Sequence, residues 1–205
     1  MAKLIVISAP SGAGKTSLIA AFLEKIKNQN FILSISFTTR PKRENEKHGE
    51  SYFFIDKQKF KKMIENNDFL EFAEVFGDFK GTSKSWVKQK LSENMNVILE
   101  LDWQGANQVK EIYSDAKTIF ILPPSYAELE LRLNSRGLDK IEEIQKRLGE
   151  ARKEIENGKS FDYLVVNDDF KSALEDLKNI IIDEKELVEK RKSLVKDSIK
   201  ALLEE

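Results

Sequence analysis

Residues 8–16 read SAPSGAGKT, and this stretch decides the fold class of the chain. It follows an apolar run at residues 4–7 and precedes an amphipathic stretch, residues 18–26, with apolar side chains every three or four positions. A strand, a glycine-rich turn ending in Gly-Lys-Thr and a helix, in this order, are typical of a phosphate-binding loop. Glycines let backbone amide groups converge on phosphate oxygens, and the N-terminus of the helix adds a positive partial charge.

The two residues that end this loop have distinct predicted roles. We expect Lys15 to reach the β and γ phosphates of a nucleoside triphosphate, and the hydroxyl of Thr16 to ligate the Mg²⁺ that bridges them. The loop is therefore predicted to bind ATP with Mg²⁺. Its other predicted ATP-binding residues are Ala9, Pro10, Ser11, Gly12, Ala13, Gly14 and Ser17.

One position departs from the usual G-x-x-x-x-G-K-[ST] pattern, because Ala9 replaces the first glycine. Ala9 precedes Pro10, and a residue before proline favours extended backbone, so a left-handed glycine is not expected to be needed there. The alternative interpretation is a glycine-rich turn with a surface lysine. The strand before the loop and the helix after it favour phosphate binding.

Apolar runs of strand length recur along the chain at residues 4–7, 97–101, 118–122 and 163–166, each followed by a helical pattern. Near-continuous apolar runs suit strands buried on both faces, and alternation with helices favours a parallel sheet with crossover helices. The prediction is an α/β fold. Its 205 residues contain no Pro-rich or Gly/Ser-rich linker, so they are expected to form one folding unit.

Two regions differ from this alternation. Short aromatic segments at 52–55 and 72–76, with one helix near 60–66, predict an inserted subdomain. Residues 184–205 are predicted to form one charged helix whose apolar stripe is interrupted by Arg191. We expect this helix to pack on its own domain, with self-association as the alternative.

Composition excludes several functional classes. Lys and Arg number 34 against 35 Asp and Glu, so global charge predicts neither a nucleic-acid nor a membrane partner. There is no cysteine and a single histidine, His48, which leaves no thiolate metal site, cysteine nucleophile or disulfide. His48 is predicted to be an exposed loop residue. The absence of a long apolar stretch and of a cleavage site predicts a cytoplasmic location.

Residues that bind the acceptor of the phosphoryl group are expected outside this loop. Arg40 and Arg43 lie three residues apart around a proline, and Tyr52 follows. Guanidinium groups suit bidentate capture of a dianionic phosphate, and a tyrosine hydroxyl can add a neutral hydrogen bond. Taken alone, two arginines and a tyrosine on a loop belong to a solvated surface more often than to a binding site.

The chain resembles the guanylate kinases from about residue 3 to 183. The segments that carry the resemblance occur in the family's order and spacing: APSGAGK at 9–15, TTR at 38–40, residues 77–81, LDWQG at 101–105, PPS at 123–125, Arg136 with Gly137, and VNDD at 166–169. The resemblance implies a P-loop kinase three-layer sandwich with a parallel core sheet. Its implied parts are a core at 1–35, 86–124 and 159–205, a GMP-binding insertion at about 36–85, and a helical lid at about 125–158.

This resemblance also implies the activity. Guanylate kinases transfer a phosphoryl group from MgATP to GMP by direct in-line transfer, making ADP and GDP in guanine nucleotide synthesis and recycling. The nucleophile is an already ionised phosphate oxygen, so no general base is required. GMP, dGMP and ATP are the implied small-molecule substrates, and both a monomer and a homo-oligomer stay open.

Family positions matching Arg40, Arg43 and Tyr52 hold the GMP phosphate, while those matching Ser36, Glu71 and Thr82 read the guanine. A carboxylate can accept hydrogen bonds from both N1 and N2 of guanine. Adenine offers no such donor pair, so it should be rejected.

Two positions depart from the family pattern. Lys80 stands in Phe-Lys-Gly where many members have Tyr-Tyr-Gly, and we expect its ammonium group to reach the GMP phosphate. Glu100 stands where an aspartate is usual, two residues before Asp102. Both of these carboxylates are expected to face the acceptor nucleoside or Mg²⁺-bound water.

On the donor side, Arg132 and Arg136 share a helix face and Arg147 lies on the next helix. The family match implies that these arginines act catalytically from a lid over ATP, and that Asn167 lies near the adenine. Ordinary surface solubility is the alternative for the arginines. Two rival functions stay open: another nucleoside monophosphate or small-phosphate kinase, and a phosphopeptide-binding scaffold domain, which usually lacks the loop lysine.

Overall fold

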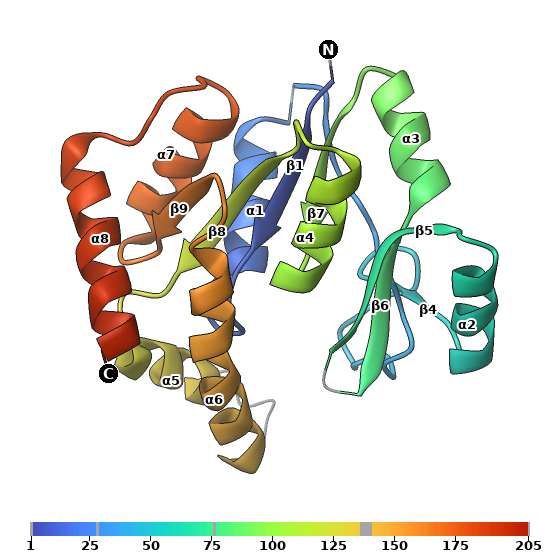
Figure 1. The fold of residues 1–205 in the computed structure, drawn as a ribbon, viewed down its shortest axis with the longest axis horizontal. Coiled ribbons are helices and arrows are strands. Elements are labelled where there is room, and N and C mark those ends of the chain that lie inside the picture. Colours follow the sequence, from blue (N-terminus) through green and yellow to red (C-terminus); the bar gives the residue numbers. More distant parts are fainter. Residues whose placement is uncertain (1, 28, 76, 136–140, 205) are drawn as a thin grey trace. The chain divides into compact units, whose positions relative to one another are not determined.

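The computed structural model describes residues 2–27, 29–75, 77–135 and 141–204 (Figure 1). The chain divides into two compact units, which are described separately below. Unit 1 comprises Met1–Ile5 and Asn30–Ala116, and unit 2 comprises Val6–Gln29 and Lys117–Glu205. In the described parts of the chain, no helix is long and apolar enough to cross a membrane.

The main sheet has five strands in the order β2-β7-β1-β8-β9. Its strands are β1 (Leu4–Ser8), β2 (Phe31–Leu33), β7 (Asn96–Glu100), β8 (Lys117–Leu122) and β9 (Tyr163–Val166). β2 pairs with β7 and β8 pairs with β9, both in parallel. The middle residues of β1, β7 and β8 are fully buried, as expected for strands covered on both faces. The predicted α/β class with a parallel sheet is confirmed, and each of the four predicted strands agrees within one residue.

The described residues of unit 2 form helices α1 (Lys15–Lys25), α5 (Tyr126–Ser135), α6 (Ile141–Gly158), α7 (Phe170–Ile181) and α8 (Glu189–Glu204). α1 contacts α7, while α8 contacts both α6 and β9. α5 packs on α6 through a buried cluster of Leu129, Leu133, Ile144 and Ala151. Ser125 precedes α5, and its hydroxyl accepts a hydrogen bond from the Glu128 amide at 3.2 Å, which caps the first turn of the helix.

Unit 1 contains a second sheet of four strands in the order β4-β3-β6-β5. Its strands are β3 (Phe37–Thr38), β4 (Phe53–Phe54), β5 (Phe69–Val75) and β6 (Asp78–Ser83), and its helices are α2 (Lys57–Glu65), α3 (Lys84–Ser92) and α4 (Trp103–Ile112). Phe60 of α2 is fully buried and stacks on Phe69 and Phe79, with ring centroids 4.4 and 5.4 Å apart. The predicted segments at 52–55 and 72–76 correspond to β4 and β5, and the helix predicted near 60–66 corresponds to α2; residue 76 lies outside the described residues.

The C-terminal helix differs from the prediction at its start. We expected a helix from residue 184, whereas α8 begins at Glu189. Glu184 has a φ of 51°, a left-handed conformation that cannot continue into a right-handed helix. The expectation that this helix packs on its own domain agrees with its contacts to α6 and β9.

Candidate functional site

The loop between β1 and α1 has the backbone geometry of an anion-binding turn. Gly12 and Gly14 have φ values of 98° and 93°, and Gly14 is the N-terminal cap of α1. Because the cap residue has no side chain, it offers no oxygen to the first-turn amide groups, a position that suits an external anion. Ala9 is absent from the positive-φ residues of the described chain, so the expectation that no left-handed glycine is needed there is confirmed.

Asn167, which directly follows β9, binds this loop through its side chain. Its buried side chain donates from Nδ2 to the carbonyl oxygen of Ala13 at 2.8 Å. A Cβ atom on Gly14 would lie 2.4 Å from the same Nδ2, which is closer than contacting atoms allow. Gly14 is therefore required both by its left-handed backbone and by the approach of Asn167.

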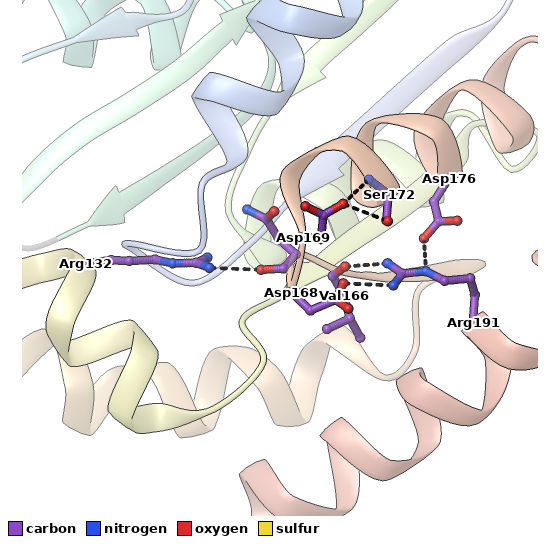
Figure 2. Close-up of polar contacts among 8 residues, drawn as sticks. Arg132, Val166, Asp168, Asp169, Ser172, Asp176 and Arg191 are labelled. Atoms are coloured by element: carbon purple, nitrogen blue, oxygen red, sulfur yellow. Dashed lines mark hydrogen bonds and ion pairs between the residues drawn. The ribbon is translucent and has the colours of Figure 1, made fainter.

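Arg132 of α5 is fixed by two partners. Its Nε donates to Glu128 Oε1 at 2.8 Å, one helical turn earlier. Its Nη2 donates to the carbonyl oxygen of Asn167 at 3.0 Å, the dashed line drawn from Arg132 in Figure 2. Its third nitrogen, Nη1, is buried and has no hydrogen-bond partner among the described residues. A buried, unsatisfied donor on a fixed guanidinium group is suited to an anionic ligand.

Arg147 of α6 reaches the loop directly, since its Nη1 donates to Ser11 Oγ at 3.0 Å. The structure therefore links Arg147 and Asn167 directly to the loop, and Arg132 to it through Asn167. Their roles in ATP binding stay predictions. Lys15 is partly exposed and Thr16 is exposed on the first turn of α1. Arg136 lies outside the described residues.

In unit 1, the predicted base-reading residues also lie together. Glu71 of β5 is only 4% exposed, and the register of β5 with β6 places it beside Thr82, which is fully buried. The hydroxyl oxygens of Ser36 and Thr82 are 3.5 Å apart. This gives a buried carboxyl group next to two hydroxyl groups.

Glu71 is the most perturbed acid of this site. Burial raises its pKa, hydrogen bonds from Thr82 oppose the rise, and the charge of Asp102 adds to it, which brings the pKa to about 7. Asp102 caps α4 by accepting from the Gly105 amide at 2.9 Å. A Cβ atom on Gly105 would lie 2.5 Å from Glu71 Oε2, so this glycine admits the carboxyl group.

The predicted phosphate-binding residues of unit 1 surround a carboxylate that the sequence did not single out. Glu46 accepts from Arg40 Nη2 at 2.6 Å and from the Arg43 amide at 2.8 Å. The guanidinium carbon of Arg40 lies 5.7 Å from the ring centre of Tyr52. Burial raises the pKa of Tyr52, and the nearby charge of Glu100 raises it further. Arg40 is therefore oriented by an acid and a ring before any ligand binds.

Most of the chain matches a known protein family. The model of the family described as "Guanylate kinase" matches residues 1–184. The chain belongs to the guanylate kinase family. It is 48% identical over 202 residues to a guanylate kinase from Vibrio parahaemolyticus, covering 98% of both chains, and 53% identical over 178 residues to one from Hahella chejuensis, covering 87% of this chain and 85% of the other. The crystal structure of the guanylate kinase from Anaplasma phagocytophilum matches with a TM-score of 0.73 at 30% identity, covering 96% of this chain and 94% of that one.

Membership of this family makes the protein an enzyme of the nucleoside monophosphate kinase class. Its helix α8 lies beyond the matched residues 1–184 of the family model. Sequence reasoning missed Glu46 and Glu128, which orient Arg40 and Arg132. Spacing could have indicated Glu128, because it lies one helical turn before Arg132. No pattern indicated Glu46, which lies on an irregular loop.

Proposed function

We infer that this protein transfers the terminal phosphoryl group of ATP to GMP and so makes ADP and GDP. The choice of GMP as acceptor rests on the buried carboxyl group of Glu71, which lies beside the hydroxyl groups of Thr82 and Ser36. An ionised Glu71 can accept from both N1 and N2 of guanine, and a hydroxyl group can donate to O6. Adenine would leave the buried carboxylate unpaired, which is costly.

The GMP phosphate is proposed to bind Arg40, Arg43 and Tyr52, with Lys80 adding charge. Arg40 is already oriented by Glu46, and the Arg43 side chain is exposed. Preorientation of this kind lowers the entropy lost when a ligand binds. We propose that Glu100 and Asp102 contact the acceptor nucleoside.

The donor phosphates are proposed to bind the loop of residues 9–17, with Lys15 on the β and γ phosphates. Arg132 supports this proposal best, because its Nη1 is a buried donor that lacks a partner within the described chain. Arg147, through its contact with Ser11, and Arg136 would add positive charge around the transferring group. Asn167 would place the adenine by holding the loop and the turn that follows β9.

Mg²⁺ is proposed to bind the hydroxyl of Thr16. In the described residues, no group of three or more His, Asp or Glu side chains could hold a metal ion alone. Mg²⁺ keeps several waters and commonly binds to few protein ligands plus substrate phosphates, so one hydroxyl group is compatible with it. When bound, the ion would neutralise charge on the β and γ phosphates.

Catalysis is proposed to depend on positioning and charge neutralisation. A phosphate oxygen of GMP is ionised at neutral pH, so the reaction needs no histidine base. Lys15 and the donor-side arginines would stabilise the oxygens of the transferring group, while Arg40 and Arg43 hold the acceptor in line. We also propose that residues 36–85 and 125–158 move over the core when both nucleotides bind, since closure would exclude water.

Two further proposals concern substrate range and location. None of the proposed base and phosphate contacts needs the ribose 2′-hydroxyl, so dGMP should also be an acceptor. A cytoplasmic location would give the enzyme access to both of its nucleotide substrates.

The experiment that tests the proposed function is a coupled assay of ADP formation from MgATP with GMP, AMP, UMP or no acceptor. The variant Lys15→Ala, which lacks a proposed ATP-binding residue, is assayed in parallel as the control. We expect strong turnover with GMP alone and its loss in the variant. Binding of GMP without turnover, or turnover with another acceptor, would overturn the proposal.

A further inference from the structure

Helix α8 contributes one side chain that binds three groups around the end of β9. Arg191 donates from Nε to Asp176 Oδ2 at 2.6 Å, from Nη1 to Asp168 Oδ1 at 2.8 Å and from Nη2 to the carbonyl oxygen of Val166 at 2.7 Å (Figure 2). The side chain is only 13% exposed. Each of the three guanidinium nitrogens has an acceptor, so the orientation of Arg191 is fixed.

Two of these acceptors flank Asn167 in the sequence. Val166 and Asp168 are bound by Arg191, while Asn167 between them faces the phosphate-binding loop and Arg132. The Asn167 side chain donates to Ala13 and its carbonyl oxygen accepts from Arg132. Val166 and Asp168 are therefore bound to α8, while Asn167 between them is bound to the proposed donor site.

The turn has two more fixed points. The Asn167 amide donates to the carbonyl oxygen of Leu122 at 2.9 Å, which continues the pairing of β8 with β9. Asp169 caps α7 by accepting from the Ser172 amide at 2.9 Å and from its hydroxyl at 2.8 Å (Figure 2). Neither contact restrains the Val166 carbonyl or the Asp168 carboxylate, so Arg191 adds a separate restraint.

A purely structural anchor would not need this arginine. α8 already buries Leu202 and Ser198, and Arg191 interrupts its apolar stripe. The Asp176 side chain is only 8% exposed, and burying a carboxylate with a guanidinium group contributes little net stability compared with apolar packing. The arginine instead fixes the positions of its three acceptors relative to one another, because its guanidinium group is planar and rigid.

We propose that Arg191 is a positioning residue for ATP: it fixes the turn of residues 166–169, and through Asn167 it sets the position of the phosphate-binding loop and of Arg132. Helix α8, which lies beyond the matched region of the family model, thereby takes part in donor binding. The inference rests on the proposed donor site at residues 9–17 and Asn167.

The test compares KM for ATP with KM for GMP in the full-length enzyme, well below the melting temperature of each variant. Arg191→Ala should raise KM for ATP about fivefold or more, since small misplacements of binding groups are costly, and leave KM for GMP nearly unchanged. Arg191→Lys should give an intermediate value, because one ammonium group cannot reproduce the fork. If KM for both nucleotides changes in parallel, or neither changes, the proposal is wrong.

The matched control is Arg152→Ala. Arg152 of α6 donates to the carbonyl oxygen of Leu203, at the other end of α8, and does not contact the turn. Its loss should loosen α8 without raising KM for ATP. An equal increase in both variants would mean that Arg191 only anchors the helix. If Arg191→Ala does not fold, the double variant Arg191→Gln with Asp176→Asn avoids the unpaired buried carboxylate and is held to the same criteria.

A double-mutant cycle with Asn167→Ala separates failure of this inference from failure of the proposed donor site. Asn167→Ala removes the side-chain contact with Ala13 but keeps the carbonyl oxygen that binds Arg132. If Arg191 acts on the loop through the Asn167 side chain, then Arg191→Ala should raise KM for ATP by a smaller factor in the Asn167→Ala background than in the wild-type background. Multiplicative effects would overturn the inference while leaving the donor site intact. If Asn167→Ala itself leaves KM for ATP unchanged, the donor site proposed here is wrong, and the inference falls with it.

Discussion

Replacing Glu71 by glutamine is expected to weaken the use of GMP and to stabilise the fold at alkaline pH. Glutamine has nearly the shape of the protonated acid, so it should fit the space beside Gly105 and Thr82. It presents one acceptor and one donor, however, where guanine N1 and N2 both donate. One guanine hydrogen would then face the amide hydrogens of the variant.

The expected loss of transition-state binding follows from the number of hydrogen bonds that Glu71 makes to guanine. Hydrogen bonds to a charged group are worth about 1.5–3 kcal/mol each, and an opposed donor pair adds a penalty, so we expect about 2–4 kcal/mol in transition-state binding. This corresponds to a fall of roughly 30- to 1000-fold in kcat/KM for GMP. KM for ATP should change little, because the donor site is built from unit 2.

The stability effect follows from the pKa of Glu71, which the fold raises from 4.5 to about 7. Between these values the folded chain keeps a proton that the unfolded chain has released. The free energy of unfolding should therefore fall as pH rises through this window, by up to about 3 kcal/mol above pH 7. Glu71→Gln removes the titration, so its free energy of unfolding should exceed that of the wild type at alkaline pH and match it near pH 4.5.

The assay has two parts: kcat/KM for GMP across pH 6–9, and denaturant unfolding at pH 5 and pH 8.5. Glu74→Gln, an exposed carboxylate on the same strand, is the control and should change neither quantity. In the wild type, GMP affinity should rise with pH through about 7, because binding requires the ionised carboxylate. A variant that keeps kcat/KM for GMP within threefold, or is less stable at pH 8.5, would refute the reasoning.

Three other changes test separate parts of the site. Lys15→Ala should lower kcat at least about 100-fold and leave the melting temperature unchanged, as measured by kinetics and thermal unfolding. A kcat comparable to that of the wild type would exclude a transition-state role for Lys15. Gly14→Ala should cost about 1–3 kcal/mol of stability and raise KM for ATP, because its φ is 93° and its Cβ would lie 2.4 Å from Asn167 Nδ2; a neutral substitution would show that the loop relaxes freely. Lys80→Ala should raise KM for GMP more at low salt than at high salt, and an unchanged KM at low salt would remove Lys80 from the phosphate site.

Local patterns predicted the parts of this protein that depend on neighbouring residues. The loop, its strand and its helix follow from glycine placement and apolar periodicity within residues 4–26, and the structure places them there. The cap of α5 is equally local, because the Ser125 hydroxyl accepts a hydrogen bond from an amide only three positions away. The start of α8 was misplaced because the left-handed backbone at Glu184 has no glycine or proline to indicate it.

Long-range contacts were beyond reach of the sequence without the family resemblance. The burial of Glu71 depends on its register with Thr82 and on the small residue Gly105, 34 positions away. Arg191 was noted only as an interruption of an apolar stripe, because its acceptors lie on β9, α7 and the turn between them. Such partners are chosen by tertiary packing, which periodicity does not encode.

The central claim is transfer of a phosphoryl group from ATP to GMP, and counting the products tests it most directly. The enzyme is incubated with MgATP and GMP, and GDP, ADP and inorganic phosphate are quantified by anion-exchange chromatography. We expect GDP and ADP in a one-to-one ratio with no phosphate above the enzyme-free control. ADP accompanied by inorganic phosphate and no GDP would contradict the account.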